Sequence, residues 1–301
     1  MTFKIENLNK SFGSKKAVNN ISIRLEEGQI LGMLGRNGAG KTTTIRMMLD
    51  LIPKDSGQIL WKGKPFSKKN LKIGYLPEER GLYAKMNVLD QIIYFGMLEG
   101  MNKKEAKREA IKWLEKLEIS YAAKKRTEQL SKGNQQKVQL ITAIIHDPEF
   151  IILDEPFSGL DPVNADMLKN VVKELIAQKK TIIFCSHQME QVESFCNQIC
   201  ILKDGNLIVS DQLVNVKKSY DYRYLELETV ASNIKDYLTL KQYKFTQENN
   251  RYKLRIPRNM KIYQIIKEFG EKFDLQGVSL KEPSLHEIFI ERTGGDGIAK
   301  L

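Results

Sequence analysis

The sequence predicts an α/β protein with a large N-terminal domain on a mixed sheet, followed by a small α+β domain. Two continuous apolar runs, at residues 30–34 and 150–153, are typical of strands buried on both faces of a sheet. The first run leads into a glycine-rich loop, and the second ends in two carboxylates. At 301 residues, the chain has room for one large core and one smaller one.

The elements of the first domain alternate between strands and helices. Short apolar or alternating stretches predict strands at 3–8, 21–25, 29–34, 59–61, 73–75, 151–154 and 181–185, with a hairpin at 199–209. Helical periodicity predicts helices at 43–49, 88–98, 104–117 and 135–145. The dipeptide Asp204-Gly205 is a strong turn signal within the hairpin. We therefore expect a strand-rich body with a helical subdomain at about 84–145.

The pattern changes after Leu213, which places the predicted domains at 1–213 and 214–301. Strands are expected at 222–227, 243–246, 252–256 and 277–280, and helices at 232–240, 261–269 and 284–291. The order β-α-β-β-α-β is that of a ferredoxin-like unit, here followed by one more helix. The second domain is therefore predicted to be a ferredoxin-like accessory domain.

The loop after the first buried run reads G-R-N-G-A-G-K-T and matches the phosphate-loop pattern G-x-x-x-x-G-K-[ST] in full. Lys41 can reach the β- and γ-phosphates, and the Thr42 hydroxyl can ligate Mg²⁺. The alternative, a glycine-rich turn before an ordinary helix, is disfavoured because strand, loop and helix all occur in order. The residues predicted to bind ATP here are Gly35, Arg36, Asn37, Gly38, Ala39, Gly40, Lys41, Thr42 and Thr43.

The second apolar run ends at Asp154 and Glu155, at the carboxyl edge where open α/β sheets bind ligands. Asp154 is predicted to hold Mg²⁺, and Glu155 to orient or deprotonate the water that attacks the γ-phosphate. An exposed acidic turn is the alternative for this pair considered alone. The phosphate loop upstream favours the catalytic interpretation.

A third motif, L-S-K-G-N-Q-Q at residues 130–136, resembles the L-S-G-G-Q signature of ATP-binding cassette (ABC) proteins. Ser131 and Gly133 match that signature, whereas Lys132 and Asn134 depart from its commonest form. The resemblance implies that Ser131 and Gly133 contact the γ-phosphate held by an opposite subunit, with a helix N-terminus as the anion site. Alone, the motif would indicate only a helix N-cap.

The same resemblance, which covers about residues 1–213, assigns four further residues. Asp161 lies in S-G-L-D, similar to the family's D-loop, and His187 occupies the place of its switch histidine. Phe12 stands where an aromatic ring stacks on adenine. Glu78 stands where most members have the Q-loop glutamine, and its carboxylate could ligate Mg²⁺ as an amide oxygen does. We therefore expect His187 to be catalytic and Glu78 to be a metal ligand.

The composition argues against several other classes of protein, namely membrane-spanning, secreted, nucleic-acid-binding and zinc-binding proteins. No apolar run approaches the length of a membrane span, and the N-terminus lacks a signal-peptide pattern. The net charge of +11 is spread over helices rich in both signs, so solvated helical faces are favoured over a nucleic-acid surface. The three cysteines together with His187 suggest a zinc site, but their spacing favours buried free thiols.

The resemblance implies the ATP-hydrolysing subunit of an ABC-2 type exporter, most like the NatA-like sodium-efflux and drug-export branch. Its expected cofactors are ATP and Mg²⁺, and its expected partners are a transmembrane permease subunit and a second copy of the chain in an ATP sandwich. We expect a peripheral position on the cytoplasmic face of the membrane and no nucleic-acid partner. A soluble ABC ATPase that acts on nucleic acid or ribosomes remains the alternative.

Overall fold

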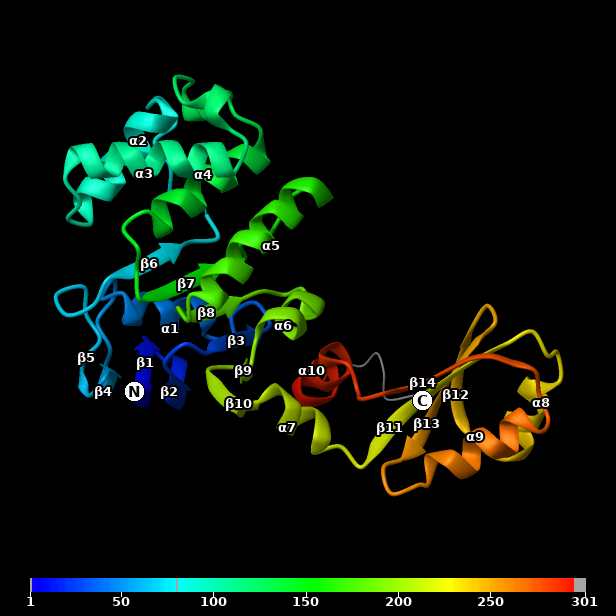
Figure 1. The fold of residues 1–301 in the computed structure, drawn as a ribbon. Helices are drawn as coiled ribbons and strands as arrows, with labels where there is room; N and C mark the ends of the chain where they lie inside the picture. Colours follow the sequence, from blue (N-terminus) through cyan, green and yellow to red (C-terminus); the bar gives the residue numbers. More distant parts are fainter. Residues whose placement is uncertain (1, 80, 295–301) are drawn as a thin grey trace. The chain divides into compact units, whose positions relative to one another are not determined.

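The structure is a computed structural model that describes residues 2–79 and 81–294. It divides into two compact units, Met1–Asp211 and Gln212–Leu301, each of which is described here by itself (Figure 1). This division falls two residues before the predicted boundary. A helix that the sequence pattern did not indicate, α7 (Leu213–Lys218), begins just beyond the division, with Leu213 and Val216 buried.

The first unit is built on a six-stranded sheet whose strands β9, β3, β8, β7 and β6 run parallel. All residues of β7 and β8 are buried, because both faces of the sheet are covered. In sheet order, the strands are β10 (Asn206–Gln212), β9 (Gln198–Lys203), β3 (Ile30–Gly35), β8 (Thr181–Cys185), β7 (Phe150–Asp154) and β6 (Ile73–Leu76). The carboxyl ends of β3, β7 and β8 therefore meet at one edge, the edge where the predicted site residues follow.

A second, antiparallel sheet has the order β2-β1-β4-β5. Its strands are β1 (Thr2–Phe12), β2 (Lys15–Glu26), β4 (Ser56–Trp61) and β5 (Lys64–Pro65). The first two are longer than predicted because backbone pairing continues to Phe12 and Lys15, past the end of the apolar alternation. The core joins both sheets and helix α1 (Lys41–Met48), and the ring of Phe3 lies 4.9 Å from that of Phe150 between centroids.

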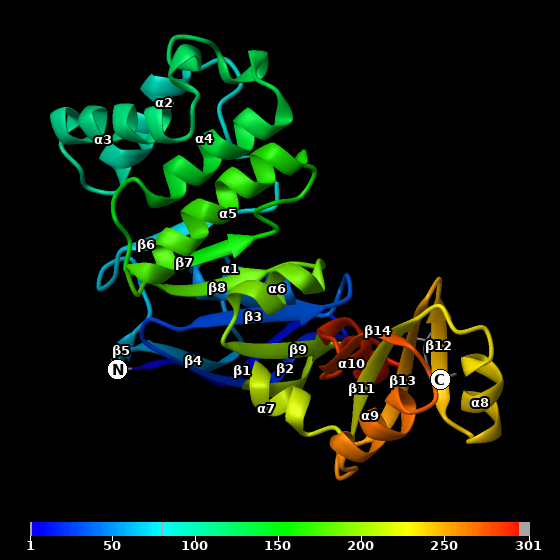
Figure 2. The same cartoon turned by 45° about the vertical axis from the view of Figure 1, so that its right-hand side comes forward.

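Helices α2 (Val88–Leu98), α3 (Lys103–Lys116) and α4 (Lys132–Ile144) pack together, with α4 against β6 (Figures 1 and 2). Two short 3₁₀ helices, η1 (Ser120–Ala122) and η2 (Thr127–Gln129), lie between α3 and α4 in the chain. Helix α4 begins three residues earlier than predicted, because the side chain of Ser131 caps it. The remaining helices of this unit are α5 (Pro162–Ala177) and α6 (Met189–Phe195).

The second unit has an antiparallel sheet in the order β12-β13-β11-β14, which confirms the ferredoxin-like prediction. Helices α8 and α9 supply residues to its core, and α10 follows the last strand. The bounds are β11 (Tyr222–Thr229), α8 (Ile234–Leu240), β12 (Lys244–Glu248), β13 (Arg251–Pro257), α9 (Ile262–Gly270), β14 (Leu275–Lys281) and α10 (Leu285–Thr293). Within residues 2–79 and 81–294, no helix is both long and apolar enough to cross a membrane.

Candidate nucleotide-binding site

The phosphate loop connects β3 to α1 and is closed by its own lysine. The Nζ atom of Lys41 donates to the carbonyl oxygens of Gly35, at 2.6 Å, and Arg36, at 3.4 Å. Gly40 has φ +105°, and a Cβ atom there would lie 2.6 Å from the carbonyl oxygen of Ala17. Only glycine fits this turn, which brings the ammonium group and the start of α1 to the same point, where a triphosphate would bind.

Three carboxylates, those of Asp154, Glu78 and Glu155, lie near one another beside this loop. Asp154, at the end of β7, is almost fully buried. Burial, together with the nearby charges of Glu78 and Glu155, raises the pKa of Asp154 to about 6, while Lys41 and Arg46 oppose the shift. Glu78 is therefore an electrostatic neighbour of Asp154, although it lies on a separate exposed loop. Such a concentration of negative charge favours a divalent cation.

The donor set fits Mg²⁺ when the nucleotide supplies the remaining oxygens. Among the described residues, no group of three His, Cys, Asp or Glu side chains could hold a metal by itself. Mg²⁺ is usually held by one or two protein oxygens together with substrate phosphates, so such a cluster is not required. The hydroxyl of Thr42 is at the exposed start of α1, and the carboxylate of Asp154 is at the sheet edge.

Glu155 and His187 form a hydrogen-bonded pair at the same edge. Oε1 of Glu155 accepts from the backbone N–H of His187 at 2.8 Å and lies 2.9 Å from its Nδ1 atom. The hydroxyl of Ser186 donates to Oε2 at 3.3 Å. Glu155 has φ +50°, a strained conformation for this residue, and its N–H donates to the carbonyl oxygen of Cys185 at 2.9 Å. The last residue of β8 thus holds the backbone of Glu155, and the two residues that follow the strand hold its carboxylate.

The signature residues lie at the N-terminus of α4, and the D-loop residue lies at the N-terminus of α5. Ser131 caps α4 through Asn134, and Asp161 caps α5 through Asn164. Hydrogen bonds from Asn164 hold the pKa of Asp161 below its usual value. Gly133 packs against Asn164, since a Cβ atom on it would lie 2.7 Å from the amide nitrogen. Within the described part of the chain, neither Ser131 nor Gly133 hydrogen-bonds to the phosphate loop.

Phe12 is an exposed aromatic ring at the end of β1. Its relative exposure is 53%, and the Nζ atom of Lys10 lies 5.4 Å from its centroid. Lys10 itself is held by Asp55 at 2.9 Å. A large apolar ring exposed to this extent is available to stack on a planar base. The adenine contact of Phe12 stays a prediction.

Several residues of the site were not found from the sequence. Arg46 contributes positive charge near Asp154, and Ser186 holds Glu155. Gln136 and Gln139 lie on the buried face of α4. The spacing of these two glutamines by three residues places them on one face of the helix, and it was a usable signal because buried amides require partners.

The possible zinc ligands do not come together. Cys185, Cys196 and Cys200 are all buried free thiols, whereas the side chain of His187 is exposed and its Nδ1 atom faces Glu155. Burial raises the pKa of Cys200 to about 12 and shifts the pKa values of the other two thiols upward as well. Protonated thiols are poor metal ligands, which agrees with the assignment of these cysteines to the core.

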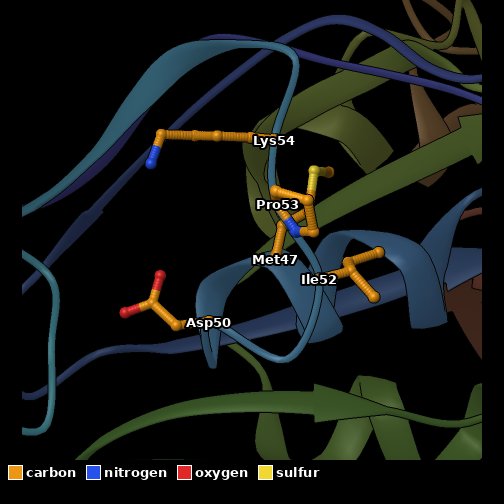
Figure 3. Close-up of a pocket in the computed structure, with 5 residues that line it drawn as sticks. All are labelled: Met47, Asp50, Ile52, Pro53 and Lys54. Carbon is orange, nitrogen blue, oxygen red and sulfur yellow. The ribbon is translucent and has the colours of Figure 1, made fainter.

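A surface hollow of about 410 Å³ lies at the opposite end of α1 from the phosphate loop (Figure 3). Its lining residues are Met47, Asp50, Ile52, Pro53 and Lys54. A helix of this length spans roughly 12 Å, so the hollow is separate from the phosphate-binding end. It has no part in the nucleotide site.

Comparison with known proteins shows the family of this chain. The family "ABC transporter" matches residues 18–158, and the family "ATP-binding protein DrrA1-3-like, C-terminal domain" matches residues 212–293. The chain is 44% identical over 293 residues to the uncharacterized ABC transporter ATP-binding protein YhaQ of Bacillus subtilis, covering 96% of this chain and 98% of YhaQ.

Two further relatives are named for transport. The bacitracin transport ATP-binding protein BcrA of Bacillus licheniformis is 31% identical over 306 residues, with 98% of both chains covered. The ABC transporter ATP-binding protein NatA of Bacillus subtilis is 34% identical over 227 residues, covering 73% of this chain and 92% of NatA.

The fold agrees with solved structures. The structure titled "Dimeric structure of a post-hydrolysis state of the ATP-binding cassette MJ0796 bound to ADP and Pi" superposes with a TM-score of 0.64 at 23% identity, covering 70% of this chain and 98% of that one. The sequence relatives are named as transporter subunits, which supports a transporter subunit and not the soluble ATPase that would act on nucleic acid or ribosomes. This chain belongs to the ABC transporter family, as an ATP-binding and ATP-hydrolysing subunit of the exporter type.

Proposed function

We propose that two copies of this chain enclose two ATP molecules, hydrolyse them, and thereby drive efflux through a separate ABC-2 type permease at the cytoplasmic face of the membrane. The observation that carries the proposal is the position of Ser131. It is an exposed helix cap that makes no hydrogen bond to the phosphate loop within the described residues. A helix N-terminus of this kind suits a phosphate bound by a second copy.

Each copy would contribute one set of catalytic groups. Lys41 and the N-terminus of α1 bind the phosphates, and Phe12 stacks on the adenine. Thr42 and Asp154, with Glu78, would hold Mg²⁺, which neutralises charge on the β- and γ-phosphate oxygens. Glu155 orients the attacking water and accepts its proton.

His187 would act on the same phosphoryl group. Its Nδ1 atom faces Glu155, so in the protonated ring Nε2–H is free to donate to the charge that develops on the γ-phosphate. The D-loop residue Asp161 would contribute from the start of α5, beside the signature glycine, Gly133. The ATP site would thus draw on residues of both copies.

The relatives support the transport part of the proposal. BcrA is named for bacitracin transport, and its similarity extends through the second unit of this chain. The MJ0796 cassette is described as a dimer bound to ADP and phosphate, which supports a dimeric arrangement here. We propose further that the chain reaches the membrane by binding the permease, and that its partner in the dimer is an identical chain.

The substitution Glu155→Gln tests the catalytic assignment. Loss of the general base should lower the rate of ATP hydrolysis by about 10²-fold or more, while ATP affinity is retained. The ATP-bound variant should accumulate as a dimer, detectable by analytical ultracentrifugation. Glu190→Gln, an exposed change on α6 close to His187, is the matched control and should hydrolyse ATP normally. Normal hydrolysis by Glu155→Gln would remove this residue from the mechanism.

Mixing two inactive variants tests the shared site. Lys41→Ala and Ser131→Ala should each abolish hydrolysis alone. In a mixed dimer, one site carries both defects and the other carries neither, so part of the activity should return. An absence of any recovery, with mixed dimers confirmed by mass spectrometry, would contradict the arrangement in which each site uses both copies.

A further inference from the structure

Among the described residues, three glutamines are buried in the helical part of the first unit. Two of them, Gln91 on α2 and Gln139 on α4, have relative exposures of 0% and 3%. A buried amide is costly unless it is hydrogen-bonded, so the partners of each glutamine indicate what it holds in place. In both cases the partners are backbone or side-chain atoms of the segments next to Glu78 and Ser131.

Gln139 holds the loop that carries Glu78. Its Nε2 atom donates to the carbonyl oxygens of Pro77 and Glu79, each at 3.1 Å, on either side of Glu78 in the chain. Gln139 belongs to the helix that Ser131 caps, about two turns further along. The backbone on both sides of Glu78 is therefore attached to the signature helix.

Gln91 makes a second attachment. Its Oε1 atom accepts from the backbone N–H of Tyr83, at 2.5 Å, and its Nε2 atom donates to the Thr127 hydroxyl at 2.7 Å. That hydroxyl in turn donates to the carbonyl oxygen of Met86 at 3.2 Å. Thr127 begins η2, which ends directly before the Leu130-Ser131 pair. The segment that follows the Glu78 loop is thus joined by hydrogen bonds to the segment that precedes Ser131.

We propose that Gln91 and Gln139 are positioning residues that make the Glu78 loop and the signature residue Ser131 move as one rigid body. Buried hydrogen bonds and a helix can transmit a displacement, because neither deforms easily. A shift of the Glu78 loop would then carry Ser131 with it. The proposal rests on the function proposed above, in which Glu78 faces the metal of one site and Ser131 faces the other.

Methionine replacements separate this role from simple core packing. Gln139→Met and Gln91→Met each keep an unbranched side chain of similar size but remove the amide oxygen and the amide nitrogen. The control is Thr142→Val, also on α4, where the lost hydroxyl donates to the backbone carbonyl oxygen of Gln139 within the same helix, at 2.8 Å. Thermal unfolding of all three variants measures any general loss of stability.

Hydrogen exchange of the full chain tests the attachment itself. In Gln139→Met, amide exchange at Glu78 and Glu79 should increase about tenfold, as expected when neutral hydrogen bonds that hold a loop are removed. In Gln91→Met the increase should appear at Tyr83, while Thr142→Val should match the wild type at all three positions. Unchanged exchange in both methionine variants would overturn the proposal, whatever their hydrolytic activity.

A double-mutant cycle tests the consequence for hydrolysis. Gln139→Met should lower kcat about tenfold, and in a Glu78→Ala background the further loss should be less than about twofold, since residues that act through one another are not additive. Full additivity would overturn the proposal and leave Gln139 as a structural residue. If Glu78→Ala itself hydrolyses ATP normally, the metal role of Glu78 fails, and the exchange measurement still decides whether the glutamines hold the loop.

Discussion

The carboxylate of Glu155 is held by two groups of His187, the backbone N–H at 2.8 Å and the ring Nδ1 atom at 2.9 Å. The two residues lie at the ends of the neighbouring strands β7 and β8, whose last paired residues are Asp154 and Cys185. The backbone contact survives replacement of the histidine by any residue except proline, which lacks the N–H. Catalytic and positional effects at this pair can therefore be separated by mutation.

His187→Ala should lower ATP hydrolysis by about 10²-fold, because it removes a hydrogen-bond donor to the developing phosphoryl charge. Thermal stability should hardly change, since the side chain is 68% exposed and the backbone contact to Glu155 remains. Steady-state hydrolysis and a melting curve measure the two effects. A large fall in melting temperature would show that the ring is structural.

Asp154→Asn should stabilise the protein in the absence of Mg²⁺ and nucleotide. The pKa of Asp154 is raised from about 3.8 to about 6 by burial and by Glu78 and Glu155, so the folded state binds an extra proton between these values. The free energy of unfolding therefore falls as pH rises through 6. At pH 8, burial of the charged carboxylate lowers the free energy of unfolding by up to about 3 kcal/mol.

Urea unfolding of wild type and Asp154→Asn at pH 4 and pH 8 measures this effect. The variant should be the more stable protein at pH 8, and the difference should shrink towards pH 4, while hydrolysis of Mg-ATP is lost. A variant that is less stable than wild type at both pH values would contradict the role of charge burial at this position.

Gly40→Ala and Gly38→Ala should differ sharply, although both glycines have positive φ. A Cβ atom on Gly40 would lie 2.6 Å from the carbonyl oxygen of Ala17, whereas one on Gly38 meets nothing within 4 Å. Gly38→Ala should therefore cost only backbone strain of about 1 kcal/mol. Gly40→Ala adds a clash with the backbone and should cost several times more, as measured by denaturant unfolding. Equal costs would show that the loop adapts.

Phe12→Ala should weaken ATP binding about tenfold without loss of stability, because the ring is 53% exposed and stacking on a base contributes roughly 1–3 kcal/mol. Phe12→Trp should keep or improve the affinity. Titration with a fluorescent ATP analogue measures both variants, and a triphosphate without a base is the control. If Phe12→Ala weakens the binding of a triphosphate without a base to the same extent, Phe12 does not stack on the adenine.

The elements that were predicted occur in the predicted order, because each depends on a local pattern, whereas helices α5, α6 and α7 were not predicted. The all-buried strand that ends at Asp154 and the loop that ends at Thr42 each have a periodicity or a spacing that is visible in the chain itself. The predicted ends of strands and helices were less accurate than their order. Helix α4 begins at Lys132 rather than 135, because its start depends on the cap supplied by Ser131.

The family, the two folds and the identity of the phosphate loop could be predicted from the chain alone, because they follow from short motifs in a fixed order. The contact of His187 with Glu155, the burial of Asp154 near Glu78, and the hydrogen bonds from Gln139 to the Glu78 loop became visible only in the folded protein. One cause accounts for all three. Hydrogen bonds and pKa shifts depend on which strands and helices become neighbours, and the glutamine and its partners are about sixty residues apart in the chain.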